Sequence, residues 1–196
     1  GYEHVGVWTH DAFLFEEGIA VLSRWPILWS DARDLPHDEV GGVATRAVLG
    51  ARLDSPFGEA QVFCTHMLAG GTEEEQADQS VAILGFMEDN PSALPSFLGG
   101  DLNAEPTTLP TQVLRGDASH DGTTGSLEDG WLAVRAGDDG FTIPSDDPDR
   151  RIDYVYAAPG SDGATATPTE CSRELTEPED GVYASDHLAV LCRYSL

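Results

Sequence analysis

Short apolar runs rich in strand-forming residues recur along the first third of the chain. The run 18–23 is broken by a proline-containing turn and resumes at 27–29. Two further runs, 43–53 and 60–65, are separated by a segment that contains both Pro and Gly, which are turn formers. We expect two strands around a turn in the first region and a β-hairpin in the second.

The apolar period becomes helical after residue 72. Thr72, followed by Glu75 three residues later, forms a capping box, and acidic residues in the first turn suit the positive end of a helix dipole. Pro91 stops the pattern. The sequence therefore predicts a helix over 73–89, with its apolar side chains at Ala77, Val81, Leu84 and Met87.

The remaining two thirds of the chain alternate between further strands and one short helix. We expect the helix over 109–114 and strands over 96–98, 141–143, 152–157, 164–171 and 188–194. Many strands with few amphipathic helices between them favour sheets packed together and covered by helices. A chain of 196 residues without repeats or linkers is predicted to form one domain over 1–196.

The charge of the chain is strongly negative. Thirty-five acidic and 10 basic residues give a net charge of −25, and all the basic residues are Arg. This composition argues against tight non-specific binding to duplex DNA at low salt, although a halophilic nuclease has the same appearance because salt screens its surface. The composition has two interpretations: an acidic surface that suits high salt or reflects biased codon usage, or cation-binding loops at 146–149 and 177–180. We interpret both segments as solvated loops.

The three cysteines and the apolar runs give further expectations. Cys64, Cys171 and Cys192 have no CxxC spacing, so we expect them to be reduced and structural. No apolar run approaches the length of a membrane span, and no basic segment followed by an apolar one begins the chain. We expect a soluble protein without a signal peptide and infer no compartment.

Acidic, amide and imidazole side chains stand where apolar runs begin or end. Asp101 and Asn103 follow one run, Asp153 lies in another, and Asp186 and His187 precede the last. A polar group at the end of a buried strand is held rigidly and faces a cleft. Phosphoester hydrolysis needs such groups, because it requires a cation to offset charge, a base for water and help for the leaving oxygen.

Each motif also has a purely structural interpretation. Asp101-Leu102-Asn103 is also a pattern for an Asx turn, and His66 after its strand is equally consistent with a capped surface histidine. Asp153 is harder to dismiss, because a carboxylate inside an apolar run is costly unless it is paired. The combination is more specific than any member. Asp101, Asp153 and Asp186 offer ligands for magnesium, and His66 and His187 offer proton transfer.

Five motifs in chain order carry a resemblance to a known family. They are Glu17-Gly18-Ile19-Ala20-Val21-Leu22-Ser23-Arg24-Trp25-Pro26-Ile27, Thr65-His66-Met67, Gly100-Asp101-Leu102-Asn103-Ala104-Glu105-Pro106, Gly140-Phe141-Thr142 with Arg151-Ile152-Asp153-Tyr154-Val155, and Ser185-Asp186-His187-Leu188-Ala189-Val190. The chain resembles the endonuclease/exonuclease/phosphatase superfamily, which includes pancreatic deoxyribonuclease, apurinic endonucleases, neutral sphingomyelinases and inositol-phosphate 5-phosphatases. The resemblance implies an α/β four-layer sandwich of two mainly antiparallel β-sheets flanked by helices, with a site for Mg²⁺ or Mn²⁺ at one edge.

The resemblance also implies roles for the candidate residues. Asp101 would orient or deprotonate the attacking water, and Asn103 would hold a phosphoryl oxygen. His187, paired with Asp153, would contact the phosphate. The remaining implied roles are that Asp186 lies at the metal side with Asp101 and Asp153, and that His66 serves the leaving group or the phosphate and is oriented by Glu17.

One departure from the family pattern concerns the start of the fold. Members begin with a strand that bears an Asn, then a helix, then a strand that ends in a metal-binding Glu, all before the Glu-Gly strand. Here Glu17 comes almost at once. We expect the N-terminal part of the sandwich to be supplied by a missing segment or a second chain, and magnesium binding by residues 1–196 alone to be weaker than in a full member.

The function predicted from the sequence is a divalent-metal-dependent phosphoester hydrolase. A phosphodiester is preferred over a monoester, because two proton-handling histidines suit a poor alkoxide leaving group. Nucleic acid, phospholipid head groups and sugar phosphates all remain open as substrates. The alternative is a non-catalytic binding or assembly module on the same scaffold, inactive because the metal Glu is absent.

Overall fold

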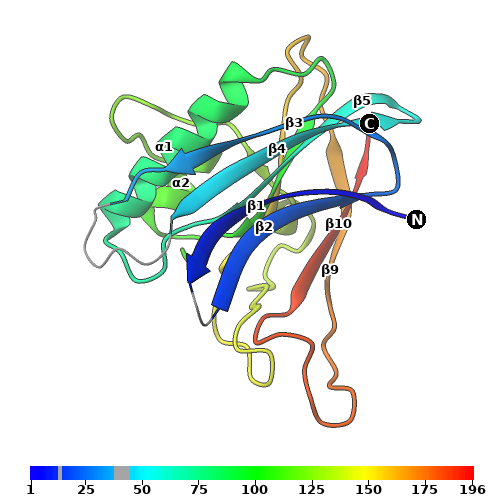
Figure 1. Cartoon of the computed structure of the whole chain (residues 1–196). Coiled ribbons are helices and arrows are strands. Elements are labelled where there is room, and N and C mark those ends of the chain that lie inside the picture. Colours follow the sequence, from blue (N-terminus) through cyan, green and yellow to red (C-terminus); the bar gives the residue numbers. More distant parts are fainter. Residues whose placement is uncertain (13–14, 38–44) are drawn as a thin grey trace.

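A computed structural model describes residues 1–12, 15–37 and 45–196 of the chain (Figure 1). Its helices and strands are, in chain order, β1 (Glu3–Ala12), β2 (Phe15–Ser23), β3 (Ile27–Leu35), β4 (Arg46–Ser55), β5 (Gly58–His66), α1 (Glu73–Asp89), β6 (Ser96–Asp101), α2 (Leu109–Arg115), β7 (Glu128–Asp129), α3 (Gly130–Val134), β8 (Asp153–Ala158), β9 (Thr167–Glu174) and β10 (Ala189–Ser195). No helix within these described ranges is long and apolar enough to cross a lipid bilayer.

The main sheet has six strands in the order β3-β4-β5-β6-β8-β7. Its neighbours are antiparallel except for β5 and β6, which are parallel and are joined by α1. One face of the sheet packs against α1, where Ile83 and Phe86 join Leu98 and Tyr156 in the largest apolar core (Figure 1). Burial of these side chains is the main force that fixes the helix on the sheet.

Two hairpins cover the opposite face of the main sheet. In the first, β1 pairs with β2, and its Val5 and Val7 pack against Leu49 of β4. In the second, β9 pairs with β10, and the ring of Tyr194 lies 4.8 Å from that of Phe97 on β6. In the part of the chain that the structure describes, the two hairpins are separate two-stranded sheets (Figure 1).

Most of the predicted elements are confirmed. The helix spans residues 73–89 with the expected capping box, and the hairpin expected from the runs 43–53 and 60–65 is present as β4 and β5. Residues 43 and 44 lie outside the described residues. The strand predicted over 141–143 is wrong, because that segment is a loop with a single bridge between Ile143 and Arg150. The sequence patterns did not predict β1, β7 or α3.

The expectation of three reduced cysteines is also wrong. Cys171 of β9 and Cys192 of β10 lie opposite each other in the strand register and form a disulfide. Only Cys64 is a free thiol, and burial raises the pKa of that thiol. The disulfide therefore covalently fixes the hairpin that carries the chain from the main sheet to the last strand.

Breaking this disulfide is expected to lower the free energy of unfolding by about 3 kcal/mol, because the bond closes a loop between residues 21 positions apart. Urea unfolding with and without dithiothreitol measures the loss. A C171A/C192A double variant is the control, since its unfolding midpoint should not respond to the reductant. Equal stability of the oxidised and reduced wild-type protein would contradict the prediction.

Candidate active site

The strand register brings three predicted site residues to one end of the main sheet. His66 closes β5 and lies beside Asp101 at the end of β6, and Asp101 lies beside Asp153 at the start of β8. Gly100 allows this approach, because it has a φ of +150° and a Cβ there would overlap the carbonyl oxygen of Thr65. Residues from three segments distant in sequence therefore share one edge.

The Asp101 loop is both an Asx turn and part of this edge. The backbone N–H of Asn103 donates to Oδ1 of Asp101 at 2.7 Å, and Asn103 has a left-handed φ of +49°. The side-chain amide of Asn103 donates to the carbonyl of Met67, and the side-chain amide of Gln76 on α1 donates to the backbone carbonyl of Asn103. The turn engages Oδ1 and leaves Oδ2 of Asp101 facing His66, 3.4 Å from its Nε2.

Asp153 holds His187 in one orientation. Its Oδ2 accepts a hydrogen bond from Oγ1 of Thr142 at 2.6 Å and lies 2.8 Å from Nδ1 of His187. Because a carboxylate can only accept, the hydrogen of the imidazole sits on Nδ1 and Nε2 is left for a ligand. The backbone N–H of Leu188 donates to the carbonyl of Thr142, which ties the start of β10 to the same loop.

His66 has two partners on its Nδ1 side. Glu17 of β2, the expected partner, places Oε1 2.9 Å from Nδ1. Arg46 of β4 places Nη1 2.9 Å from the same nitrogen and 2.5 Å from the Glu17 oxygen. Burial lowers the pKa of His66, and the positive charge of Arg46 lowers it further, so the ring favours its neutral form at neutral pH.

One group of ligand atoms fits a divalent cation. Asp101, Asp153 and His187 each offer an atom within 4.8 Å of the others. Burial raises the pKa of Asp101, and the neighbouring Asp153 carboxylate also raises it, against the Asn103 N–H, which lowers it. The two crowded carboxylates suit a cation such as Mg²⁺ or Mn²⁺, whose charge would offset their mutual repulsion.

Asp186, the third expected metal ligand, is not part of this group. Its side chain is exposed on the loop before β10, where Ser185 donates to it. The acidic loops 146–149 and 177–180 also supply no such group among the described residues. A second group, Asp78, His120 and Asp121, lies at the surface, where the 2.7 Å contact of His120 with Asp78 ties α1 to the loop after α2.

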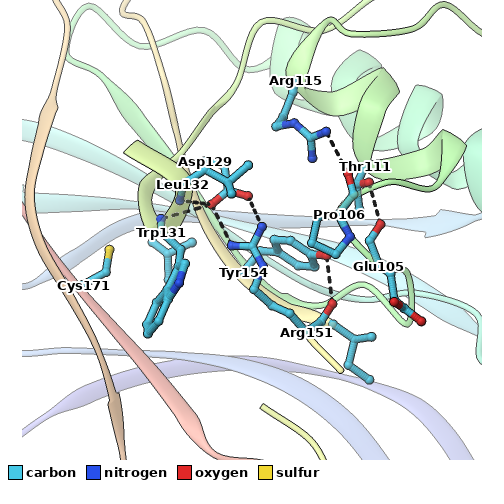
Figure 2. Close-up of polar contacts among 12 residues, drawn as sticks. Glu105, Pro106, Thr111, Arg115, Asp129, Trp131, Leu132, Arg151, Tyr154 and Cys171 are labelled. Carbon is cyan, nitrogen blue, oxygen red and sulfur yellow. Dashed lines mark hydrogen bonds and ion pairs between the residues drawn. The ribbon is translucent and has the colours of Figure 1, made fainter. Parts of the chain in front are cut away.

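A buried ion pair stabilises the segment that leads into β8. The guanidinium of Arg151 binds both carboxylate oxygens of Asp129, at 3.1 and 2.8 Å, and lies over the ring of Tyr154 (Figure 2). The single hydrogen of the Tyr154 hydroxyl is shared between two carbonyls, that of Ala104 at 2.7 Å and that of Arg151 at 3.0 Å. The segment before Asp153 and the segment after Asn103 are thereby held by the same hydroxyl.

Sequence reasoning missed two residues of this neighbourhood, Arg46 and Thr142, as functional groups. No motif in the sequence singles out Arg46, and the composition of 141–143 predicts a strand at Thr142. An arginine at the start of a strand carries no local signal that it will meet a histidine 20 positions later. Thr142 is fully buried, and a buried threonine next to an acid is recognisable only once the fold is known.

The layered α/β fold brings paired carboxylate and histidine side chains to one sheet edge, and metal-assisted hydrolysis uses groups of this kind. The sequence matches the endonuclease/exonuclease/phosphatase family over residues 8–187, and the chain belongs to this family. Members of the family are hydrolases that include phosphodiesterases and phosphatases. No curated protein matches the chain.

Solved structures confirm the predicted α/β sandwich class. An endonuclease/exonuclease/phosphatase from Beutenbergia cavernae is 25% identical with a TM-score of 0.66 over 95% of this chain and 52% of that one. Bacteroides thetaiotaomicron mannosyl-6-phosphatase is 20% identical (TM-score 0.78; 100% and 78%), and humanized D. rerio TDP2 is 15% identical (TM-score 0.72; 98% and 77%). The chain thus spans about half the length of the first relative and about three quarters of the others.

Proposed function

We propose that this chain carries the catalytic residues of a divalent-metal-dependent phosphoester hydrolase that attacks phosphorus with an activated water. The observation that supports the proposal best is the meeting of Asp101, Asp153 and His187 at one sheet edge, with His66 beside them. Their side chains are 18–28% exposed, so they are held by the fold and still reachable by a substrate.

The hydrogen bonds of the site residues support a different role for each of them. Asp101, with Oδ1 engaged by the Asx turn, has Oδ2 available to orient water or to accept its proton. His187, with Nδ1 engaged by Asp153, has only Nε2 free, and Nε2 would donate to a phosphoryl or leaving oxygen when the ring is protonated. A cation held by the carboxylates of Asp101 and Asp153 would offset the charge that develops on the phosphoryl oxygens.

A phosphodiester is the proposed substrate class. Two histidines near one pair of carboxylates provide hydrogen bonding on more than one side of the phosphate, which helps an alkoxide leave. The absence of Lys and the charge of −25 disfavour tight binding to a duplex at low salt. The candidate sources of the phosphoester are a nucleic acid, a phospholipid head group and a sugar phosphate.

We further propose that a strand from outside residues 1–196 lies between β2 and β10 and completes the second sheet. Within the described residues, β2 pairs only with β1 and β10 only with β9, while β2 packs over β4 and β5 and β10 packs over β8. Half-buried Phe97 belongs to β6, the strand between β5 and β8, and lines a cavity of about 430 Å³ beside β10. A structure of the complete protein with β2 paired directly to β10 would contradict this proposal.

The test of the proposed function is hydrolysis of bis(p-nitrophenyl) phosphate and p-nitrophenyl phosphate by the complete protein. We expect cleavage with Mg²⁺ or Mn²⁺, faster for the diester, and its loss on addition of EDTA. Asp101→Ala and His187→Ala should each lower kcat by at least about 10²-fold, the usual effect of removing a positioned acid or base. Asp89→Ala, in an exposed ion pair on α1, should leave it unchanged.

Two outcomes would reject the hydrolase. Full activity in both Asp101→Ala and His187→Ala would show that the cleavage does not use this site. Binding of Mn²⁺ by the complete protein, lost in Asp101→Ala, together with no cleavage of either ester, would instead favour the non-catalytic module on the same scaffold.

A further inference from the structure

The Nδ1 atom of His66 lies in a triangle with two charged side chains. Nη1 of Arg46 is 2.9 Å from it, Oε1 of Glu17 is 2.9 Å from it, and those two atoms are 2.5 Å apart. The arginine side chain is only 10% exposed. Where the single hydrogen of a neutral His66 sits, on Nδ1 or on Nε2, is therefore decided by which neighbour binds Nδ1.

The geometry favours the arginine. An arginine N–H can only donate, so its contact with Nδ1 is favourable only when Nδ1 offers a lone pair. The Arg46 contact has the angles of a hydrogen bond, whereas the contact with Glu17 is close without forming one. A hydrogen on Nδ1 would also bring two N–H groups face to face at 2.9 Å.

Backbone contacts hold this arrangement in register. The N–H and the hydroxyl of Thr45, next to Arg46, both donate to the carbonyl of Thr9 on β1, at 2.9 and 2.6 Å. The Thr9 hydroxyl in turn donates to the carbonyl of Glu17 at 3.4 Å. The start of β4 and the Glu17 position of β2 are thus tied together independently of the charged side chains.

We propose that Arg46 is a positioning residue that holds His66 as the tautomer with its hydrogen on Nε2. Glu17 then acts on His66 indirectly, by accepting the arginine and fixing its direction. This differs from the arrangement expected from the sequence, in which Glu17 itself orients the ring.

The proposal gives the two histidines of the site opposite roles. In its neutral form, His187 donates its Nδ1–H to Asp153 and has its lone pair on Nε2. His66 presents an Nε2–H on the side of Asp101. If the proposed function holds, on which this step rests, His66 donates a hydrogen bond to a phosphoryl or leaving-group oxygen and takes no proton from water.

The test is a long-range ¹H–¹⁵N correlation spectrum of the complete ¹⁵N-labelled protein at a pH where His66 is neutral. The His66 signals are assigned by their loss in His66→Gln. We expect the hydrogen on Nε2 in the wild type and in Arg46→Lys, which keeps a donor. In Arg46→Met it should move to Nδ1, facing Glu17, while Glu17→Gln should leave it on Nε2.

A wild-type spectrum with the hydrogen on Nδ1 would overturn the proposal, as would an Arg46→Met spectrum identical to wild type. If Arg46→Met does not fold, the wild-type and Glu17→Gln spectra decide. In the hydrolase assay, Arg46→Met should lower kcat by about 10- to 100-fold through misplacement of His66, with a smaller change in KM and partial recovery in Arg46→Lys. An inactive wild type with Nε2–H would reject the proposed function and leave the tautomer assignment standing.

Discussion

Asp153→Ala is expected to lower kcat of the proposed hydrolase by about 10³-fold, because one carboxylate serves three purposes. It accepts the Nδ1–H of His187, it accepts the hydroxyl of Thr142, and it is one of three potential ligands in the group with Asp101. Its removal frees the His187 ring to rotate and takes a negative charge from the cation site.

A graded pair of variants separates these purposes. Thr142→Val keeps the carboxylate and His187 but removes one of the two donors, so we expect a loss of about tenfold. Mn²⁺ binding should weaken by at least about tenfold in Asp153→Ala and change little in Thr142→Val. Steady-state kinetics and Mn²⁺ titration measure both. Wild-type turnover in Asp153→Ala would contradict the proposed site, and equal losses in the two variants would contradict the division of roles.

Local signals explain which elements the sequence predicts well. The helix over 73–89 has its acidic first turn within its own residues and its cap and its stop within two residues of its ends, and the structure reproduces both ends. The β4–β5 hairpin likewise depends on a turn between its own strands. Neither element needs information from distant parts of the chain.

The misassigned elements depend on distant partners. The segment 141–143 has a strand-like composition, but Thr142 turns its hydroxyl to Asp153 and its backbone bonds to Arg150 and Leu188. The pairing of Cys171 with Cys192 follows from the register of β9 and β10. The spacing of the cysteines along the sequence does not supply that register, so the sequence does not predict the disulfide. Such features become visible only after the sheet has been assembled.

The candidate site follows the same rule. Asp101, Asp153 and His187 were predicted as members of one site from motif order and resemblance, and the structure places them together. The role of Asp186 as a metal ligand stays a prediction. Its side chain is exposed and lies outside that group. The Arg46 contact with His66 depends on how β2, β4 and β5 pack, so no motif in the sequence predicts it.

The largest loss of stability is expected from Asp129→Ala. Asp129 and Arg151 are 2% and 1% exposed, and removing one partner leaves the other charge buried without compensation, which costs about 3–5 kcal/mol. The carboxylate also accepts the backbone N–H groups of Trp131 and Leu132 at the start of α3, a cap whose loss costs about 1 kcal/mol more (Figure 2).

Urea unfolding of three variants tests this account. Asp129→Asn keeps an acceptor for the helix cap and removes the charge, so it should be less destabilising than Asp129→Ala. Asp89→Ala breaks the exposed pair with Arg33 and should cost at most about 1 kcal/mol. If Asp129→Ala cost no more than Asp89→Ala, the buried pair would not be what holds the segment before Asp153. A large loss in both Asp129 variants would agree with this account and locate most of the stability in the charge, because the cap survives in Asp129→Asn.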